Sequence, residues 1–454
     1  YLEGLGIKGI WLMPINPSPS SHGYDVTDYY AVNPDYGTME DFKRLLEEAH
    51  KRDIRIIIDF VMNHSSSRHP WFQQALTPGS PYHDWYVWSE TDPGTLGPWG
   101  AKAWYRASNG LYYYAIFWDQ MPDLNYENPA VREEFKKITS FWLEEVGIDG
   151  FRLDAVRYVV EGDQLADSKA NHAFLEEWGQ YYRSLNPQAF SVGEAWTDNG
   201  NVKKYTDTNR ELDSAFNFDL SQAMFKLNEG NTTSLRFVLQ TTIRDFPDQD
   251  NANFITNHDM PRVMNQLGAD KEQRARLAAN ILLTAPGIPF IYYGEEIGMQ
   301  RGPAGGDAGL RTPMSWTGNA SNAGFSTGTP YRSLSGNVTT FNVAAQQADP
   351  ASLLNFYKAM LSLRKAHPAL AAGSYERELV QGKVMSFQRA LGGERVVVAI
   401  NYGTTAASAS ITGLPANATL DSTYPADGAD LLADAGGRAD AGVPAQSVRV
   451  YAVR

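Results

Sequence analysis

Hydrophobic residues in the first half of the chain form short runs that alternate with amphipathic segments. The segment 39–52, MEDFKRLLEEAHKR, carries apolar residues at helical spacing. The next segment, 54–64, IRIIIDFVMNH, is an almost continuous β-branched run. Runs of this kind are typical of parallel strands that are buried on both faces. The alternation therefore predicts βα units rather than a bundle or an all-β fold.

The same rhythm continues along the chain and predicts a barrel. A helix over 131–146 precedes a strand over 147–154, and a helix over 174–185 precedes a strand over 190–196. Further strands are expected within 6–15, 212–220, 252–259 and 288–298. About seven strands at this spacing favour a (β/α)₈ barrel over an open sheet. Because the chain opens on a helix end that runs into a strand, we expect the first barrel strand and the natural N-terminus to lie upstream of Tyr1.

Two long segments and a change of pattern indicate further domains. Residues 65–125 lack helical periodicity and are rich in Trp, Tyr, Pro and Gly, which predicts a small domain inserted after the third barrel strand. Residues 301–345 form a second excursion, and beyond a helix over 351–367 short strands predict a C-terminal β-sandwich. The predicted domains are a barrel over 1–64 and 126–370, an inserted domain over 65–125 and a β-sandwich over 371–454.

Composition narrows the class of protein. The net charge of −13 and the pI of about 5.1 argue against a nucleic-acid partner, which requires a basic face. The sequence contains no apolar run of roughly 18 residues, so we expect no membrane partner. Cysteine is absent, which excludes disulfides and thiolate metal sites. We expect a monomer.

The stretch GIDGFRLDAV (147–156) ends an apolar strand with two charges. With a side-chain period of two, Arg152 and Asp154 lie on one face, about 7 Å apart along the strand. The pair is either a structural ion pair or a carboxylate kept ionised by a fixed cation at the mouth of the barrel.

Other acidic residues favour the second interpretation. Asp59, Asp154, Glu194 and Asp259 each follow or end a predicted strand, and active sites of such barrels lie at the C-terminal strand ends. Two carboxyl groups about 5 Å apart perform retaining glycoside hydrolysis, one as an ionised nucleophile and one as an acid. Arg152 would keep Asp154 ionised, and apolar surroundings would raise the pKa of Glu194. Strand-end histidines, His64 and His258, suit structural hydrogen bonds or sugar hydroxyls better than zinc.

Seven motifs in order resemble the α-amylase family, glycoside hydrolase family thirteen. They are GIKGIWLMP, DFVMNH, MPDLN, GFRLDAVRY, VGEAW, FITNHD and YYGEEIGM. The resemblance covers nearly the whole chain. It implies Asp154 as the nucleophile, Glu194 as the general acid/base and Asp259 as the stabiliser of the transition state.

The resemblance also implies roles for neighbouring residues. Arg152 positions Asp154 and is braced by Asp59. The residues expected to bind substrate are Tyr24, His64, Arg152, Trp196 and His258, with Tyr24 as a stacking platform. Asn63 matches the family's calcium-ligand asparagine, so calcium is expected as a structural ion.

The substrate is expected to be an α-glucan, cut within the chain at α-1,4 bonds. MPDLN resembles a group of α-amylases intermediate between oligo-1,6-glucosidases and neopullulanases. Ala155 favours α-1,4 specificity, because α-1,6-specific relatives usually carry valine at this position. Ser21 favours endo action, because exo-acting glucosidases typically have an aspartate there. In contrast, RTPMSW (311–316) resembles the glucosidases, and Arg157-Tyr158 replaces the Lys-His pair of α-amylases.

The alternatives that stay open are an exo-α-glucosidase or oligo-1,6-glucosidase, a transglycosylase, and a catalytically silent binding subunit. Starch polymers do not readily cross membranes, which favours a secreted or periplasmic enzyme. No signal peptide is visible, and a cytoplasmic maltodextrin enzyme is the other candidate.

Overall fold

A computed structural model of the chain describes residues 1–162, 164–207, 211–226, 232–268 and 270–454. The chain divides into two compact units. The first comprises Tyr1–Trp196 and Asn201–Phe216, and the second Thr197–Gly200 and Asn217–Arg454. The boundaries of the three predicted domains stay a prediction. None of the helices described is both long and apolar enough to span a bilayer.

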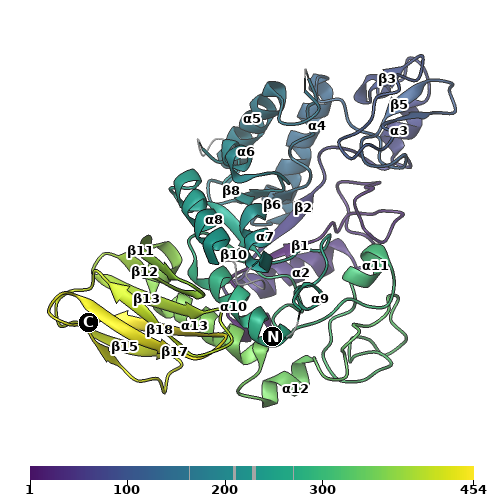
Figure 1. Ribbon diagram of the computed structural model, residues 1–454. Helices are drawn as coiled ribbons and strands as arrows, with labels where there is room; N and C mark the ends of the chain where they lie inside the picture. Colours follow the sequence, from purple (N-terminus) through teal and green to yellow (C-terminus); the bar gives the residue numbers. More distant parts are fainter. Residues whose placement is uncertain (163, 208–210, 227–231, 269) are drawn as a thin grey trace. The chain divides into compact units, whose positions relative to one another are not determined.

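A parallel sheet forms the centre of the first unit. Its described strands follow one another in chain order and lie side by side (Figure 1): β1 (Gly9–Leu12), β2 (Arg55–Phe60), β6 (Gly150–Leu153), β7 (Phe190–Gly193) and β8 (Ser214–Phe216). The isoleucines of β2 explain its place inside the sheet, because Ile56 and Ile58 are fully buried. The strands lie within the segments predicted for them but are shorter.

Local sequence signals set the helices of this unit. Helix α2 (Met39–His50) begins at a capping box, in which Thr38 Oγ1 accepts from the Asp41 N–H and the Asp41 carboxylate accepts from the Thr38 N–H. Helix α5 (Lys169–Leu185) is capped by Ser168 and begins five residues before the segment predicted. The segment predicted as one helix over 131–146 is α4 (Pro129–Ser140) followed by a π-helical turn over Phe141–Val146. A short helix, α1 (Leu2–Leu5), precedes β1.

The aromatic residues of segment 65–125 pack against one another. This segment holds α3 (Pro70–Ala75) and an antiparallel sheet in the order β3 (Trp88–Ser89), β5 (Tyr112–Tyr114), β4 (Trp104–Arg106). Phe72 lies at its centre, with ring centroids 5.8 Å from Trp88 and 5.0 Å from Tyr113. Much of the Trp and Tyr content that marked this segment in the sequence therefore builds a small core.

The second unit contains a further parallel pair, β9 (Asn251–Phe254) and β10 (Ile288–Phe290). Four longer helices accompany the pair in the described residues: α7 (Phe218–Lys226), α8 (Thr232–Asp245), α10 (Lys271–Thr284) and α13 (Leu353–Ala366). Of these, the sequence pattern predicted only α13. Shorter helices are α9 (Val263–Gln266), α11 (Gly306–Leu310), α12 (Val343–Ala348) and α14 (Pro368–Ala372).

The C-terminal part of this unit is all β, as predicted (yellow-green to yellow in Figure 1). A six-stranded antiparallel sheet has the order β11-β12-β13-β18-β15-β16, and a second sheet pairs β14 with β17. Val397 of the first sheet and Ile411 of the second belong to one buried apolar cluster, so the two sheets share a core. The strands are Ser374–Gln381, Val384–Leu391, Glu394–Asn401, Ala407–Thr412, Thr419–Tyr424, Leu431–Leu432, Arg438–Val443 and Ser447–Val453, in chain order from β11 to β18.

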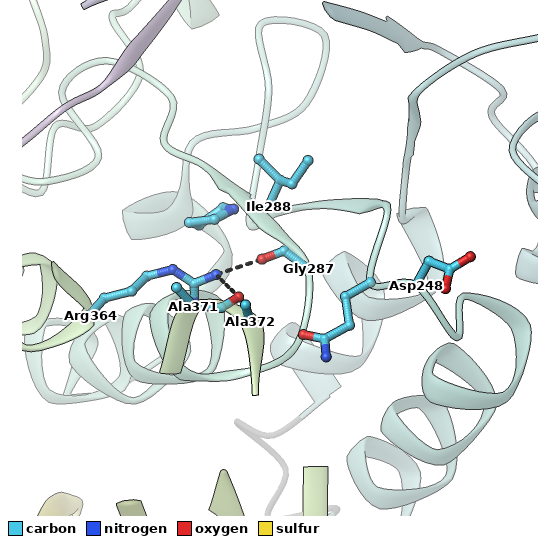
Figure 2. A pocket seen from close by; sticks show the side chains of 8 residues that line it. Asp248, Gly287, Ile288, Arg364, Ala371 and Ala372 are labelled. Carbon is cyan, nitrogen blue, oxygen red and sulfur yellow. Dashed lines mark hydrogen bonds between the residues drawn. The ribbon is translucent and has the colours of Figure 1, made fainter. Parts of the chain in front are cut away.

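Two arginines of this unit donate to main-chain carbonyl oxygens. Arg389 of β12 is fully buried and donates to the carbonyls of Thr284 and Gly373 at 2.6 and 2.8 Å. Arg364 of α13 donates to the carbonyl of Gly287 at 2.7 Å, beside a cavity of about 330 Å³ that Asp248 and Ile288 also line (Figure 2). This cavity lies where β10 begins, at the end opposite to a barrel active site.

A buried carboxyl group lies in the turn after β10. The Tyr357 hydroxyl donates to Glu295 Oε1 at 2.8 Å, and both side chains are buried. Burial raises the pKa of Glu295 to about 8, although the Tyr357 hydrogen bond lowers it and neighbouring Glu296 raises it further. The folded protein therefore keeps a proton on Glu295 at neutral pH.

We expect Glu295→Gln to remove a pH dependence of stability. The carboxyl of an unfolded chain has a pKa of about 4.3. Because the folded value is raised, the contribution of Glu295 is fully present below pH ~4.3 and is lost as the pH rises towards about 8. The melting temperature of the wild type should thus fall between pH 5.5 and 8.5 relative to that of the variant, measured by thermal unfolding. Glu127→Gln, at an exposed position, is the control; parallel curves for the wild type and Glu295→Gln would contradict the prediction.

Candidate active site

A single buried guanidinium lies at the centre of the site in the first unit. Arg152 of β6 is 1% exposed. Its Nη1 lies 2.9 Å from Asp59 Oδ1 and 2.7 Å from Asp154 Oδ1, and its Nη2 lies 2.7 Å from Glu194 Oε2. The expected pair of Arg152 with Asp154 and the expected brace from Asp59 are both present. Arg152 also binds Glu194, which the sequence did not indicate.

The register of the sheet explains this convergence. Asp59 of β2 and Arg152 of β6 are direct neighbours across the parallel pair. Leu153 of β6 pairs with Gly193 of β7, so Asp154 and Glu194 each follow a strand at the same edge. Adjacent parallel strands thus place three carboxylates around one cation at their C-terminal ends.

Electrostatics make the cluster interdependent. Burial opposes the charge of Arg152, but the neighbouring acids outweigh it and hold its pKa well above the usual range. Burial raises the pKa of Asp59 to about 6, and Arg152 acts in the opposite direction. The expectation that Glu194 has apolar surroundings is wrong in one respect, because Arg152 binds one of its oxygens.

Aromatic rings cover the buried cation. The guanidinium lies 4.8 Å from the ring centroid of Trp11 and 5.9 Å from that of Tyr24. Trp11 Nε1 and the Tyr24 hydroxyl both donate to Asp59 Oδ2, at 3.2 and 3.0 Å. Sequence analysis missed Trp11; its position inside a predicted strand, one strand before Asp59, was the available signal.

His64 and Asn63 follow β2 and are buried. Burial lowers the pKa of His64 to about 3, so the ring is neutral and suited to hydrogen bonds with hydroxyls. Trp196, two residues after Glu194, is 47% exposed and offers a planar ring beside the acid.

The surroundings of Asn63 bear on the expected calcium ion. Asn63 Nδ2 donates to Asp123 Oδ2 at 3.1 Å, while its buried Oδ1 has no hydrogen-bond partner within the described residues. Burial, and after it the charge of Glu161, raises the pKa of Asp123. An unsatisfied amide oxygen on a side chain that binds Asp123 matches in kind the oxygen ligands that calcium prefers. The described residues contain no cluster of three His, Cys, Asp or Glu side chains that could hold a metal ion, so main-chain or amide oxygens would have to complete the set.

His258 and Asp259 belong to the second unit. Asp259 Oδ2 lies 3.2 Å from His258 Nε2, and Asp259 Oδ1 lies 2.6 Å from Arg311 Nη2. The Asp259 N–H donates to Asn257 Oδ1 at 3.0 Å, which fixes the backbone of this turn after β9. Arg311, the first residue of RTPMSW, was not predicted as a site residue although the motif was noted.

Comparisons with known proteins decide the family. A model described as "Alpha amylase, catalytic domain" matches residues 1–373. The chain belongs to the α-amylase family. It is a glycosidase of this family, and the predicted enzyme class is confirmed.

The relatives of the chain carry several activities. The chain is 40% identical over 410 residues to α-amylase 3 of Dictyoglomus thermophilum, covering 88% of this chain and 78% of that protein. It is 34% identical to trehalose-6-phosphate hydrolase of Escherichia coli and 31% identical to oligo-1,6-glucosidase of Parageobacillus thermoglucosidasius, in each case over 88% of this chain and 84% of the relative.

A solved relative shows the fold class. The crystal structure of an α-amylase from H. orenii matches with a TM-score of 0.87 at 34% identity, covering 99% of this chain and 91% of that one. The predicted fold class, a barrel followed by a C-terminal β domain, is confirmed.

We expect Arg152→Lys to abolish most activity. The single nitrogen of an ammonium group cannot replace both Nη1, which contacts Asp59 and Asp154, and Nη2, which contacts Glu194. Breaking a buried charged contact costs roughly 3–5 kcal/mol. The value of kcat/KM for a nitrophenyl maltooligosaccharide should fall at least ~100-fold. The control is Arg183→Lys, in another arginine–aspartate pair of this unit with 2.8 Å to Asp213. Near wild-type kcat/KM in Arg152→Lys would show that the shared cation is dispensable.

Proposed function

We propose that this glycosidase hydrolyses α-1,4-glucosidic bonds within starch and maltooligosaccharides, with retention of configuration. The observation that carries the endo assignment is Ser21, an exposed small residue three positions before Tyr24. An aspartate there would close the site at the non-reducing end of the sugar chain. Serine leaves room for a longer chain to continue past the cleavage site.

The arrangement around Arg152 supports a double-displacement mechanism. Asp154, with one oxygen bound to Arg152, attacks the anomeric carbon through its other oxygen and forms a glycosyl-enzyme intermediate. Glu194 protonates the leaving glycosidic oxygen; since Arg152 binds Oε2, the proton is carried by Oε1. Glu194 then accepts a proton from the water that releases the sugar. By the family resemblance, Asp259 would bind the 2- and 3-hydroxyls as the oxocarbenium-like state forms. His64, His258 and Tyr24 are further residues proposed to bind substrate.

An exo-acting α-glucosidase or oligo-1,6-glucosidase is the second candidate. The contact of 2.6 Å between Arg311 of RTPMSW and Asp259 favours it, because this motif resembles the glucosidase side of the family. The oligo-1,6-glucosidase among the relatives points the same way.

Substrate comparison tests the two candidates. We expect fast cleavage of a maltoheptaoside blocked at its non-reducing end and slow attack on maltose and isomaltose, measured by chromatography of the products. Ser21→Asp should reduce cleavage of the blocked substrate, while Ser21→Asn, of the same size but uncharged, should reduce it less. Asp154→Asn sets the background level. If the blocked substrate is not cleaved and glucose is released from maltose or isomaltose, endo action is rejected in favour of the second candidate.

We further propose calcium as a structural ion held by Asn63 with Asp123, where it would stabilise the segment 65–125. Added calcium should raise the melting temperature of the wild type after chelator treatment. Asp123→Asn should abolish this rise, while Asp92→Asn, at an exposed position in the same segment, should retain it. An unchanged wild-type melting temperature, or a rise of equal size in Asp123→Asn, would contradict this site.

A further inference from the structure

A bidentate ion pair closes the loop that follows Asp154. Arg157 Nε and Nη2 lie 3.0 and 2.6 Å from the two oxygens of Asp167. The main chain closes at the same place, because the Asp167 N–H donates to the Arg157 carbonyl at 2.9 Å. Buried Tyr205 adds a third contact, since its hydroxyl donates to Asp167 Oδ1 at 2.5 Å. The Arg157 side chain is thus held in one orientation by groups from both sides of the loop.

The guanidinium of Arg157 also contacts the segment that follows β7 and contains Glu194. Its Nη1 donates to the carbonyl oxygen of Trp196 at 3.0 Å. Trp196 lies two residues after Glu194 in the segment that leaves β7. Through Arg157, the loop after Asp154 and the segment after Glu194 are therefore joined beside the two carboxylates.

These contacts define what Arg157 can do. Three of its five N–H groups point at Asp167 and at the Trp196 carbonyl, so these protein atoms fix the orientation of the guanidinium. Trp196 itself is 47% exposed, and a planar ring at this place can stack on a sugar face. A fixed carbonyl at Trp196 restricts the directions in which that ring can point.

We propose that Arg157, oriented by Asp167 and Tyr205, is a positioning residue for the leaving-group side of the cleavage site. It fixes the backbone of Trp196 so that the indole stacks on the sugar that departs when Asp154 attacks. The same ring would hold an acceptor sugar when a sugar hydroxyl replaces water in the second step. This inference rests on the proposed glycoside hydrolysis and assigns the leaving-side contact that a Lys-His pair would otherwise make.

A comparison of two substrates distinguishes a leaving-side role of Arg157 from a general structural role. Maltoheptaose needs leaving-side contacts, whereas α-maltosyl fluoride has only fluoride as its leaving group. Arg157→Leu should lower kcat/KM for maltoheptaose roughly tenfold, the loss expected for an interaction of about 1.4 kcal/mol. The value for α-maltosyl fluoride should change less than ~2-fold. Asp167→Asn, which keeps the shape of the partner but weakens the pair, should give a smaller loss of the same kind.

The chain contains a matched control pair in the same unit. Arg183 binds Asp213 through Nε and Nη2 at 3.1 and 2.8 Å, and the Tyr182 hydroxyl donates to Asp213 at 2.5 Å. Asp213 precedes β8, so this pair lies at the amino-terminal edge of the sheet. Arg183→Leu should change the two substrates by the same factor.

A double variant tests whether Arg157 acts through Trp196. In a Trp196→Ala background, Arg157→Leu should cause no further loss on maltoheptaose, because the two changes remove one interaction. The proposal would be overturned if the losses in kcat/KM of the two single variants multiply in the double variant. Equal losses on both substrates in the Arg157→Leu and Asp167→Asn variants would also overturn it. Inactivity of the wild type on both substrates would instead reject the proposed function.

Discussion

The buried charge of Arg152 constrains the first unit of this protein. A guanidinium that is 1% exposed must be compensated, and three carboxylates from neighbouring strands provide the compensation. The cation in turn holds the carboxylates that would otherwise repel one another. The rings of Trp11 and Tyr24 cover the guanidinium, and both side chains donate to Asp59, so the cation and its acids form one polar network.

Buried arginines elsewhere in the chain are compensated differently. Arg389 and Arg364 donate mainly to carbonyl oxygens, and burial lowers the pKa of Arg364 to about 10. Carbonyl dipoles satisfy a cation without creating a reactive carboxylate. Arg152, at the C-terminal ends of the strands, binds carboxylates. Arg364, beside the start of β10, and Arg389 bind mainly main-chain carbonyls and so join secondary structures.

Membership of the α-amylase family agrees with the catalytic roles proposed for the carboxylates but leaves the substrate open. Proteins 31–40% identical to this chain include an α-amylase, a trehalose-6-phosphate hydrolase and an oligo-1,6-glucosidase. Differences among such enzymes must lie in groups that surround the shared carboxylates. In this chain those groups include the Arg157–Asp167 pair, whose arginine also donates to the carbonyl of Trp196.

The sequence by itself determined the βα rhythm, the all-β C-terminal part and the strand-end carboxylates, because these follow from local periodicity and from the order of motifs. It predicted the Arg152–Asp154 pair for the same reason, since residues two apart on a strand share a face. Helices α7, α8 and α10 escaped prediction, and the packing of aromatic rings around Phe72 was not foreseen. Only the tertiary structure decided that Glu194 binds Arg152, that Trp11 covers it and that Arg157 turns to Asp167 and Trp196. These contacts depend on strand register and on loop closure. Both bring together residues that are far apart in the sequence, so a local sequence pattern does not predict them.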